Sequence, residues 1–115
     1  MGEETVFSRI AKGEIPAKIV HEDADVVAFR DVSPRAPVHI LVIPRRVIAR
    51  IDAAGPGDAE LLGRLLLAAR EVARREGIDK TGYRLVINNG ADGGETVPHL
   101  HVHLLGGRAM GWPPG

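Results

Sequence analysis

Three histidines alternate with apolar residues near the end of the 115-residue chain, at positions 99, 101 and 103. Side chains at alternate positions of a strand face the same side, so this spacing predicts three imidazoles on one face, roughly 7 Å apart. A purely structural role is disfavoured because histidine is a poor core residue and three imidazolium groups would repel one another. Two interpretations remain. One is a His-x-His metal site completed by His39, and the other is an imidazole nucleophile or base whose neighbours orient it and bind anions.

The segment that precedes these histidines favours the second interpretation. Residues 88–96 contain three glycines, with Asn88 and Thr96 as neutral hydrogen-bonding groups. Such a segment alone is typical of a flexible hairpin loop. Glycines also permit positive-φ turns that point successive N–H groups into one concavity, which can hold an anion. A metal site would need nearby carboxylates, and only Glu95 and Asp92 are available. Beside a histidine face we therefore expect a phosphate or oxyanion cradle without metal.

The rest of the chain predicts the elements that position these groups. We expect short and long helices at 5–12 and 58–76, and strands at 17–22, 26–32, 38–43, 83–89 and 99–105. Hairpin-like pairs of strands around one inserted helix favour an antiparallel α+β domain over a doubly wound sheet. The long helix, with Asp58 as its N-cap, has an apolar arc about 160° wide, more than one sheet requires. This arc predicts either deep burial or contact with a second subunit.

Composition narrows the function classes. The chain has 15 basic and 15 acidic residues and no net charge, which argues against a protein that coats nucleic acid or an anionic membrane. It has no cysteine, which excludes a disulfide scaffold and a thiolate zinc site. Because no transmembrane span or signal peptide is recognisable, we expect a soluble cytoplasmic protein.

Several segments together resemble the histidine triad (HIT) superfamily, and in particular its Hint branch, the histidine triad nucleotide-binding proteins. The resemblance covers nearly the whole chain and includes residues 14–20, 29–37, 39–44, 99–105 and 106–115. The triad alone is moderately specific. Its combination with Asp-x-Ser-Pro-x-Ala-Pro at 31–37 and the closing Trp-Pro-Pro-Gly at 112–115 is very specific.

The resemblance implies a single HIT domain over residues 1–115, with a five-stranded antiparallel sheet, one long helix and one short helix. It also implies a two-fold homodimer, in which the tail at 106–115 packs near the partner subunit's site and Trp112 shapes substrate specificity. The implied reaction is hydrolysis of purine nucleoside 5′-phosphoramidates through a covalent nucleotidyl-histidine, without metal or cofactor. The implied ligand is an AMP- or GMP-type nucleotide. A slow or inactive nucleotide-binding scaffold of the same fold is the alternative.

The matching motifs also assign roles by resemblance. His101 would attack the α-phosphorus, and His103 would contact the phosphate and the leaving group. His39 and His99 would orient the site, and Asp31 would bind the ribose hydroxyls; from the residues alone, a turn-capping aspartate is the favoured interpretation of Asp31. The residues implied to frame the base are Val6, Phe7, Ile10, Phe29, Val32 and Leu41. Those implied to line the phosphate side are Asn88, Gly94, Glu95 and Thr96.

One departure from the family pattern affects the site directly. Glu95 stands where this branch usually has glutamine, so a neutral amide is replaced by a carboxylate. An ionised carboxylate beside the scissile bond would repel the phosphate. We therefore expect Glu95 to alter the rate and the leaving-group preference more than the class of reaction.

Overall fold

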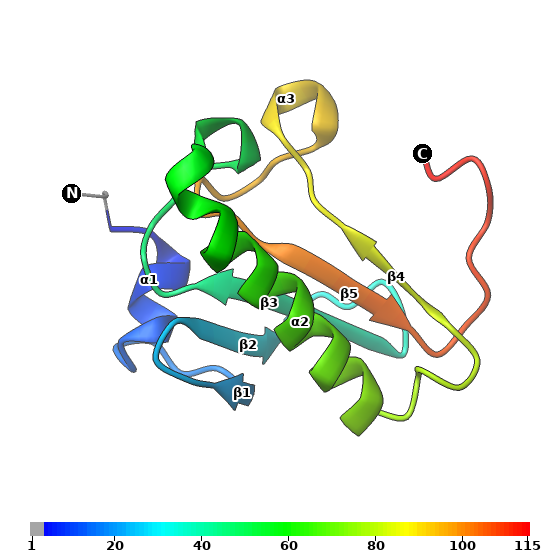
Figure 1. Ribbon diagram of the computed structural model, residues 1–115. Coiled ribbons are helices and arrows are strands. Elements are labelled where there is room, and N and C mark those ends of the chain that lie inside the picture. The colour runs from blue at the N-terminus through cyan, green and yellow to red at the C-terminus, as the bar shows by residue number, and fades with distance from the viewer. Residues whose placement is uncertain (1–3) are drawn as a thin grey trace.

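The computed structural model describes residues 4–115 (Figure 1). Its elements are α1 (Val6–Ala11), β1 (Ile19–Glu22), β2 (Val26–Arg30), β3 (Val38–Pro44), two 3₁₀ turns (Ile51–Ala53 and Pro56–Asp58), α2 (Ala59–Arg75), β4 (Tyr83–Val86), α3 (Gly90–Gly93) and β5 (Val102–Gly106). The strands form one antiparallel sheet in the order β1-β2-β3-β5-β4. The predicted α+β class, with five antiparallel strands and one long helix, is confirmed.

The sheet is covered on both faces, by α2 on one side and by α1 on the other (Figure 1). β3 lies in the middle, and this position explains its nearly uninterrupted apolar sequence. Its side chains alternate between the two layers, so that Ile40 and Val42 pack toward α2 while Leu41 and Ile43 pack toward α1. The α1 layer is completed by Phe7, Ile10, Val27 and Phe29. This second, smaller layer is the one that carries the site.

α2 follows a 3₁₀ turn that starts at Pro56, and it ends before Gly77, whose φ is +77°. Asp58 occupies the N-cap position but does not cap α2, because its carboxylate accepts a hydrogen bond from the N–H of Gly55 instead. The helix buries one side against the sheet and leaves Leu66 and Leu67 exposed, at 46% and 55%. No helix within residues 4–115 is long and apolar enough to cross a membrane.

The predicted strand at 99–105 is wrong at its start. β5 begins only at Val102, because the N–H of His99 donates to Val97 and that of Leu100 donates to Ile48, outside the ladder. The alternation of faces nevertheless holds, since Leu100, Val102 and Leu104 all pack in the α2 layer.

The other predicted boundaries differ by a few residues. β1 begins two residues late, and β2 and β4 end before their predicted ends. The glycine-rich segment 88–96 is more than a loop, because α3 forms within it and ends at Gly94 with a φ of +83°. The glycines thus supply a compact turn beside the histidines.

Gly107 follows β5 with a φ of +88°, and a Cβ built there would lie 2.9 Å from Cβ of Pro37. We expect Gly107→Ala to lower the free energy of unfolding by roughly 1–3 kcal/mol, since left-handed backbone alone costs an L-residue about 1–2 kcal/mol. Gly111→Ala is the matched control, because an added Cβ there meets nothing within 4 Å. Urea unfolding should distinguish the two variants, and equal stabilities would contradict the role given to Gly107.

Candidate active site

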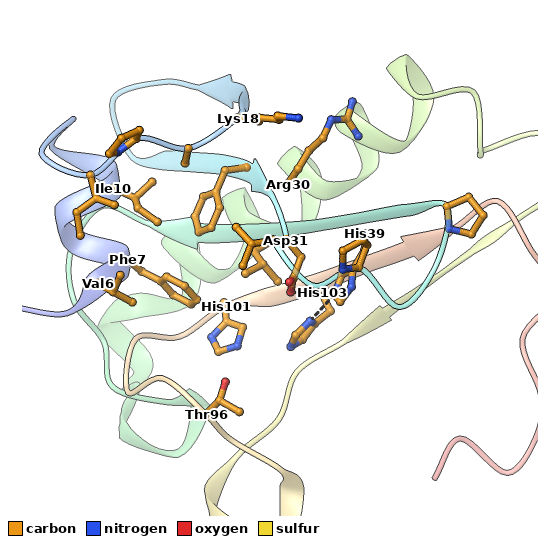
Figure 2. A pocket seen from close by; sticks show the side chains of 18 residues that line it. Val6, Phe7, Ile10, Lys18, Arg30, Asp31, His39, Thr96, His101 and His103 are labelled. Carbon is orange, nitrogen blue, oxygen red and sulfur yellow. Dashed lines mark hydrogen bonds and ion pairs between the residues drawn. The ribbon is translucent and has the colours of Figure 1, made fainter.

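A cleft of about 1010 Å³ opens on the α1 side of the sheet (Figure 2). Ile10 lies toward one end, His39 and His103 lie toward the other, and Phe7 and His101 stand between them. The first end is apolar, and Phe7 meets Phe29 edge to face with ring centroids 5.3 Å apart. The cleft therefore suits a ligand with a flat apolar group at one end and a polar group at the other.

His101 is held in one tautomer by the backbone. Its Nδ1 lies 2.7 Å from the carbonyl oxygen of His99, which can only accept, so Nδ1 carries the proton and donates it. Nε2 of the neutral ring then keeps its lone pair. The ring is nearly buried and is packed edge to face on Phe7, at 5.1 Å between centroids. In the neutral form of the ring, an Nε2 that is fixed in a cleft is suited to act as a nucleophile or a base.

His99 supports this arrangement from behind the cleft. Its Nε2 donates to the carbonyl oxygen of Pro44 at 2.7 Å, so its Nδ1 accepts from the hydroxyl of Thr5 at 2.8 Å. Thr5 is also the N-cap of α1 and accepts from the N–H of Ser8. The side chain of His99 is fully buried, and that burial lowers its pKa. His99 is therefore a neutral structural link between α1, β3 and His101.

His39 and His103 form a second chain of hydrogen bonds. The N–H of Arg35 donates to Nδ1 of His39 at 3.0 Å, which places the proton of His39 on Nε2. This Nε2–H donates to Nδ1 of His103 at 2.9 Å, drawn as a dashed line in Figure 2. His103 consequently carries its own proton on Nε2. The ring centroid of His103 lies 4.9 Å from that of His101, so the two imidazoles are neighbours in the cleft.

Burial keeps His39 and His103 neutral at pH 7. It lowers the pKa of His103 to about 4, and repulsion from His101 and His39 contributes further. Burial also lowers the pKa of His39, against the opposing effect of Asp31. Both rings therefore retain the single proton that the chain from Arg35 requires.

Asp31 follows β2 directly and faces the same end of the cleft. One carboxylate oxygen accepts from the N–H of Ser33 at 2.8 Å, and the other lies 3.4 Å from Nε2 of His39. Ligand atoms of Asp31, His39 and His103 lie within 4.8 Å of one another, as a metal site would require. Metal bound at Nε2 of His39 would move that ring's proton to Nδ1, where it would oppose the N–H of Arg35. The hydrogen bonds thus favour the pair of imidazoles over a metal.

The segment 88–96 is closed by an ion pair. Arg50 donates from Nε and Nη2 to the two carboxylate oxygens of Glu95, at 2.8 and 2.9 Å, and the N–H of Gly90 donates to one of them at 2.9 Å. These contacts, with Arg50 first, lower the pKa of Glu95 to about 2. The carboxylate of Glu95 is therefore negatively charged at neutral pH, as expected, but its charge is paired with that of Arg50.

A model of the HIT domain matches residues 12–110 of this chain. The chain belongs to the HIT family. An uncharacterised HIT-like protein of Synechocystis sp. is 56% identical over 115 residues, 100% of each chain. The structure of the HIT family hydrolase from Legionella pneumophila Philadelphia 1 has a TM-score of 0.95 at 50% identity, covering 97% of this chain and 100% of that one. The histidine triad nucleotide-binding protein from Candida albicans has a TM-score of 0.82 at 29% identity, covering 96% and 83%.

Most of the residues that the sequence assigned to the site do line the HIT cleft. They are Val6, Phe7, Ile10, Phe29, Asp31, Val32, His39, Leu41, Thr96, His101 and His103. The predicted family is confirmed by the matching HIT model. The structure brings these side chains together in one cleft. Their individual roles, and the Hint branch, remain predictions.

Five assigned residues do not line the cleft. His99 lies behind it, while Asn88, Gly94 and Glu95 belong to the adjoining segment without facing in. Trp112 is 83% exposed in the C-terminal tail, where the guanidinium of Arg84 lies 6.0 Å from its ring centroid.

Sequence reasoning missed several contributors. The HIT cleft is also lined by Ile15, Pro16, Ala17, Lys18, Arg30, Pro34 and Pro37. All seven fall in segments that carried the family resemblance, which was the available signal. Arg50 lies 45 positions from Glu95 and gave none, because an ion pair between distant segments leaves no local pattern.

Because His103 is partly buried and neutral, we expect the free energy of unfolding to fall as the pH is lowered. An unfolded histidine titrates near pH 6.5, whereas His103 in the folded protein titrates near 4, so the unfolded state binds more protons between these values. This contribution to stability is complete above pH 6.5 and is lost as the pH falls toward 4; it amounts to at most about 3 kcal/mol. Urea unfolding from pH 7 to 4 should show a shallower decline for His103→Asn. Parallel declines for both proteins would contradict this prediction.

Proposed function

We propose that this protein hydrolyses purine nucleoside 5′-phosphoramidates to an amine and a nucleoside monophosphate, with His101 as the nucleophile. One observation carries the proposal: the carbonyl of His99 holds the proton of His101 on Nδ1 and so leaves Nε2 free in the cleft. Two relatives support the class. The Legionella protein is called a hydrolase and the Candida protein a nucleotide-binding protein.

The form of the cleft supports a nucleotide ligand. A purine fits between the apolar side chains around Phe7 and Phe29, which offer ring edges and faces. The carboxylate of Asp31 can accept hydrogen bonds from two ribose hydroxyls. Thr96 and His103 then lie on the phosphate side, where their donors can meet charge on the phosphoryl oxygens.

The proposed reaction proceeds in two displacements. Nε2 of His101 bonds to the α-phosphorus as the P–N bond to the leaving group breaks, and the leaving nitrogen departs as an amine after taking a proton from solvent. The resulting imidazolium donates its Nδ1–H to the carbonyl of His99, which disperses the new positive charge. Water then attacks phosphorus, which yields the nucleoside monophosphate, neutral His101 and a proton to solvent. His103 donates from Nε2 to the phosphoryl oxygen or the leaving nitrogen.

The proposal includes no metal and no cofactor, in keeping with the hydrogen bonds of His39. A cytoplasmic location, as well as the absence of nucleic acid or membrane partners, remains a prediction from composition. The alternative, a slow nucleotide-binding scaffold, would use the same cleft and differs only in turnover.

We expect His101→Ala to lower turnover of an adenosine 5′-phosphoramidate by several orders of magnitude, because the attacking nitrogen is lost. AMP affinity should stay within about tenfold, or about 1.4 kcal/mol, because the apolar end and Asp31 remain. Amine release and calorimetric AMP binding measure the two quantities. Near-normal turnover of the variant would sink the nucleophile assignment, and AMP binding by a wild-type protein without turnover would favour the scaffold. A chelator should leave wild-type turnover unchanged.

A two-fold homodimer is the second part of the proposal. β4 forms an open edge of the sheet, and the exposed apolar side chains of Leu85 and Ile87 lie on it or directly after it. On α2, Leu66 and Leu67 are exposed as well. Soluble proteins seldom leave an unprotected apolar strand edge, so pairing with a second copy gives these residues a partner. The tail, with its exposed Trp112, would then reach the partner subunit's cleft.

Deletion of residues 110–115 should therefore change leaving-group preference while the dimer persists. The decisive measurement mixes chains: a full-length His101→Ala subunit is paired with a tail-deleted subunit that retains His101. If the tail acts across the interface, the site with intact His101 in one subunit receives the intact tail of the other. The substrate profile of the hybrid then returns to that of wild type. A hybrid with the profile of the tail-deleted homodimer would show that the tail does not act across the interface.

A further inference from the structure

Arg50 and Glu95 form a two-pronged ion pair beside the histidines. Arg50 lies in the connection between β3 and α2, and Glu95 lies at the end of the segment that contains α3. Only 11% of the Glu95 side chain is exposed, and both of its oxygens are occupied by Arg50, with Gly90 as an additional donor. The pair is therefore a built, half-buried contact, unlike a surface pair that solvent screens.

Glu95 belongs to the segment that borders the reacting groups. Its neighbour in the chain, Thr96, lines the cleft together with His101. An unpaired carboxylate at this place would face the same space as an incoming phosphate, and like charges at short range are costly. In the family pattern this position usually holds neutral glutamine, so this chain has a charge to cancel.

We propose that Arg50 is a positioning residue for the phosphate side of the site: it cancels the charge of Glu95 and turns the carboxylate from the cleft, so that an anionic nucleotide can bind. The inference rests on the proposed function, since it assumes that a phosphate lies beside His101 and Thr96. The ion pair then serves in this chain as one neutral unit.

Four variants, compared with wild type, distinguish this charge effect from a role of the ion pair in anchoring the segment 88–96. In Arg50→Gln the carboxylate is left without its cation and repels phosphate. In Glu95→Gln the guanidinium is left without its anion and attracts phosphate. The double variant Arg50→Gln/Glu95→Gln is neutral again, although it has lost the ion pair as an anchor. Arg64→Gln is a matched control, because Arg64 lies on α2 at the other face of the sheet and does not line the cleft.

The measurement is the calorimetric affinity of each protein for AMP and for adenosine at pH 7.5. AMP affinity should fall about tenfold in Arg50→Gln, hold or rise in Glu95→Gln, and return to within about threefold of wild type in the double variant. Adenosine, which has no phosphate, should bind all five proteins alike. The Arg64→Gln control should match wild type for both ligands.

A pH series adds a readout that anchoring would not affect. Between pH 7.5 and 4.5, the AMP affinity of Arg50→Gln should approach that of the double variant, because the unpaired Glu95 regains a carboxyl pKa nearer its ordinary value and becomes protonated. The ratio of AMP affinities between wild type and the double variant should not change over this pH range, because the pKa of the paired Glu95 is about 2.

The outcomes separate the inference from the function on which it rests. If wild type binds AMP but the double variant binds it as weakly as Arg50→Gln, the pair is only an anchor and the inference is overturned. If Arg50→Gln binds AMP and adenosine as wild type does, the inference is likewise overturned. A wild-type protein that binds neither ligand overturns the proposed function itself, and the inference with it.

Discussion

The hydrogen bond from Nδ1 of His101 to the carbonyl of His99 determines what the rest of the site is able to do. An imidazole has two nitrogens of nearly equal basicity, and a free side chain would present either one to the cleft. A backbone carbonyl removes this ambiguity because it can only accept. The N–H of Arg35 acts in the opposite sense on His39, since it can only donate. Main-chain groups thus select the tautomers of both chains of histidines.

The sheet makes these main-chain contacts possible. The pairing of β3 with β5 places His39 opposite Leu105 and Leu41 opposite His103, so the two imidazole-bearing segments are adjacent in the register. The apolar layer under α2 excludes water from the opposite face. His39 and His103 are consequently buried enough to stay neutral while they still border an open cleft. The site therefore depends on unequal covering of the two faces of the sheet: the long helix α2 shields one face, and the short helix α1 leaves part of the other face open as the cleft.

Local patterns predicted much of this structure. The apolar run of β3 and the breadth of the apolar arc of α2 are properties of single elements, and both could be read from neighbouring residues. The triad spacing likewise placed His101 and His103 at the cleft. What could not be predicted depends on contacts between distant segments. The N–H of Leu100 donates to Ile48 outside the sheet and so shortens β5, and Arg50 pairs with Glu95, which lies 45 positions later in the chain. Neither contact has a signature within one segment.

The position of α1 has a consequence for how this site can change. Its N-cap, Thr5, hydrogen-bonds to the histidine that holds His101, and two residues later Phe7 forms part of the apolar wall and contacts the ring of His101 itself. One short helix therefore supports both the surface that selects a ligand and the group that would react with it. A substitution that enlarges or narrows the apolar end by moving α1 also moves His101, the proposed nucleophile. Selectivity and reactivity in this cleft are mechanically coupled, and adaptation to a ligand of another size must preserve the helix position or accept a change in rate.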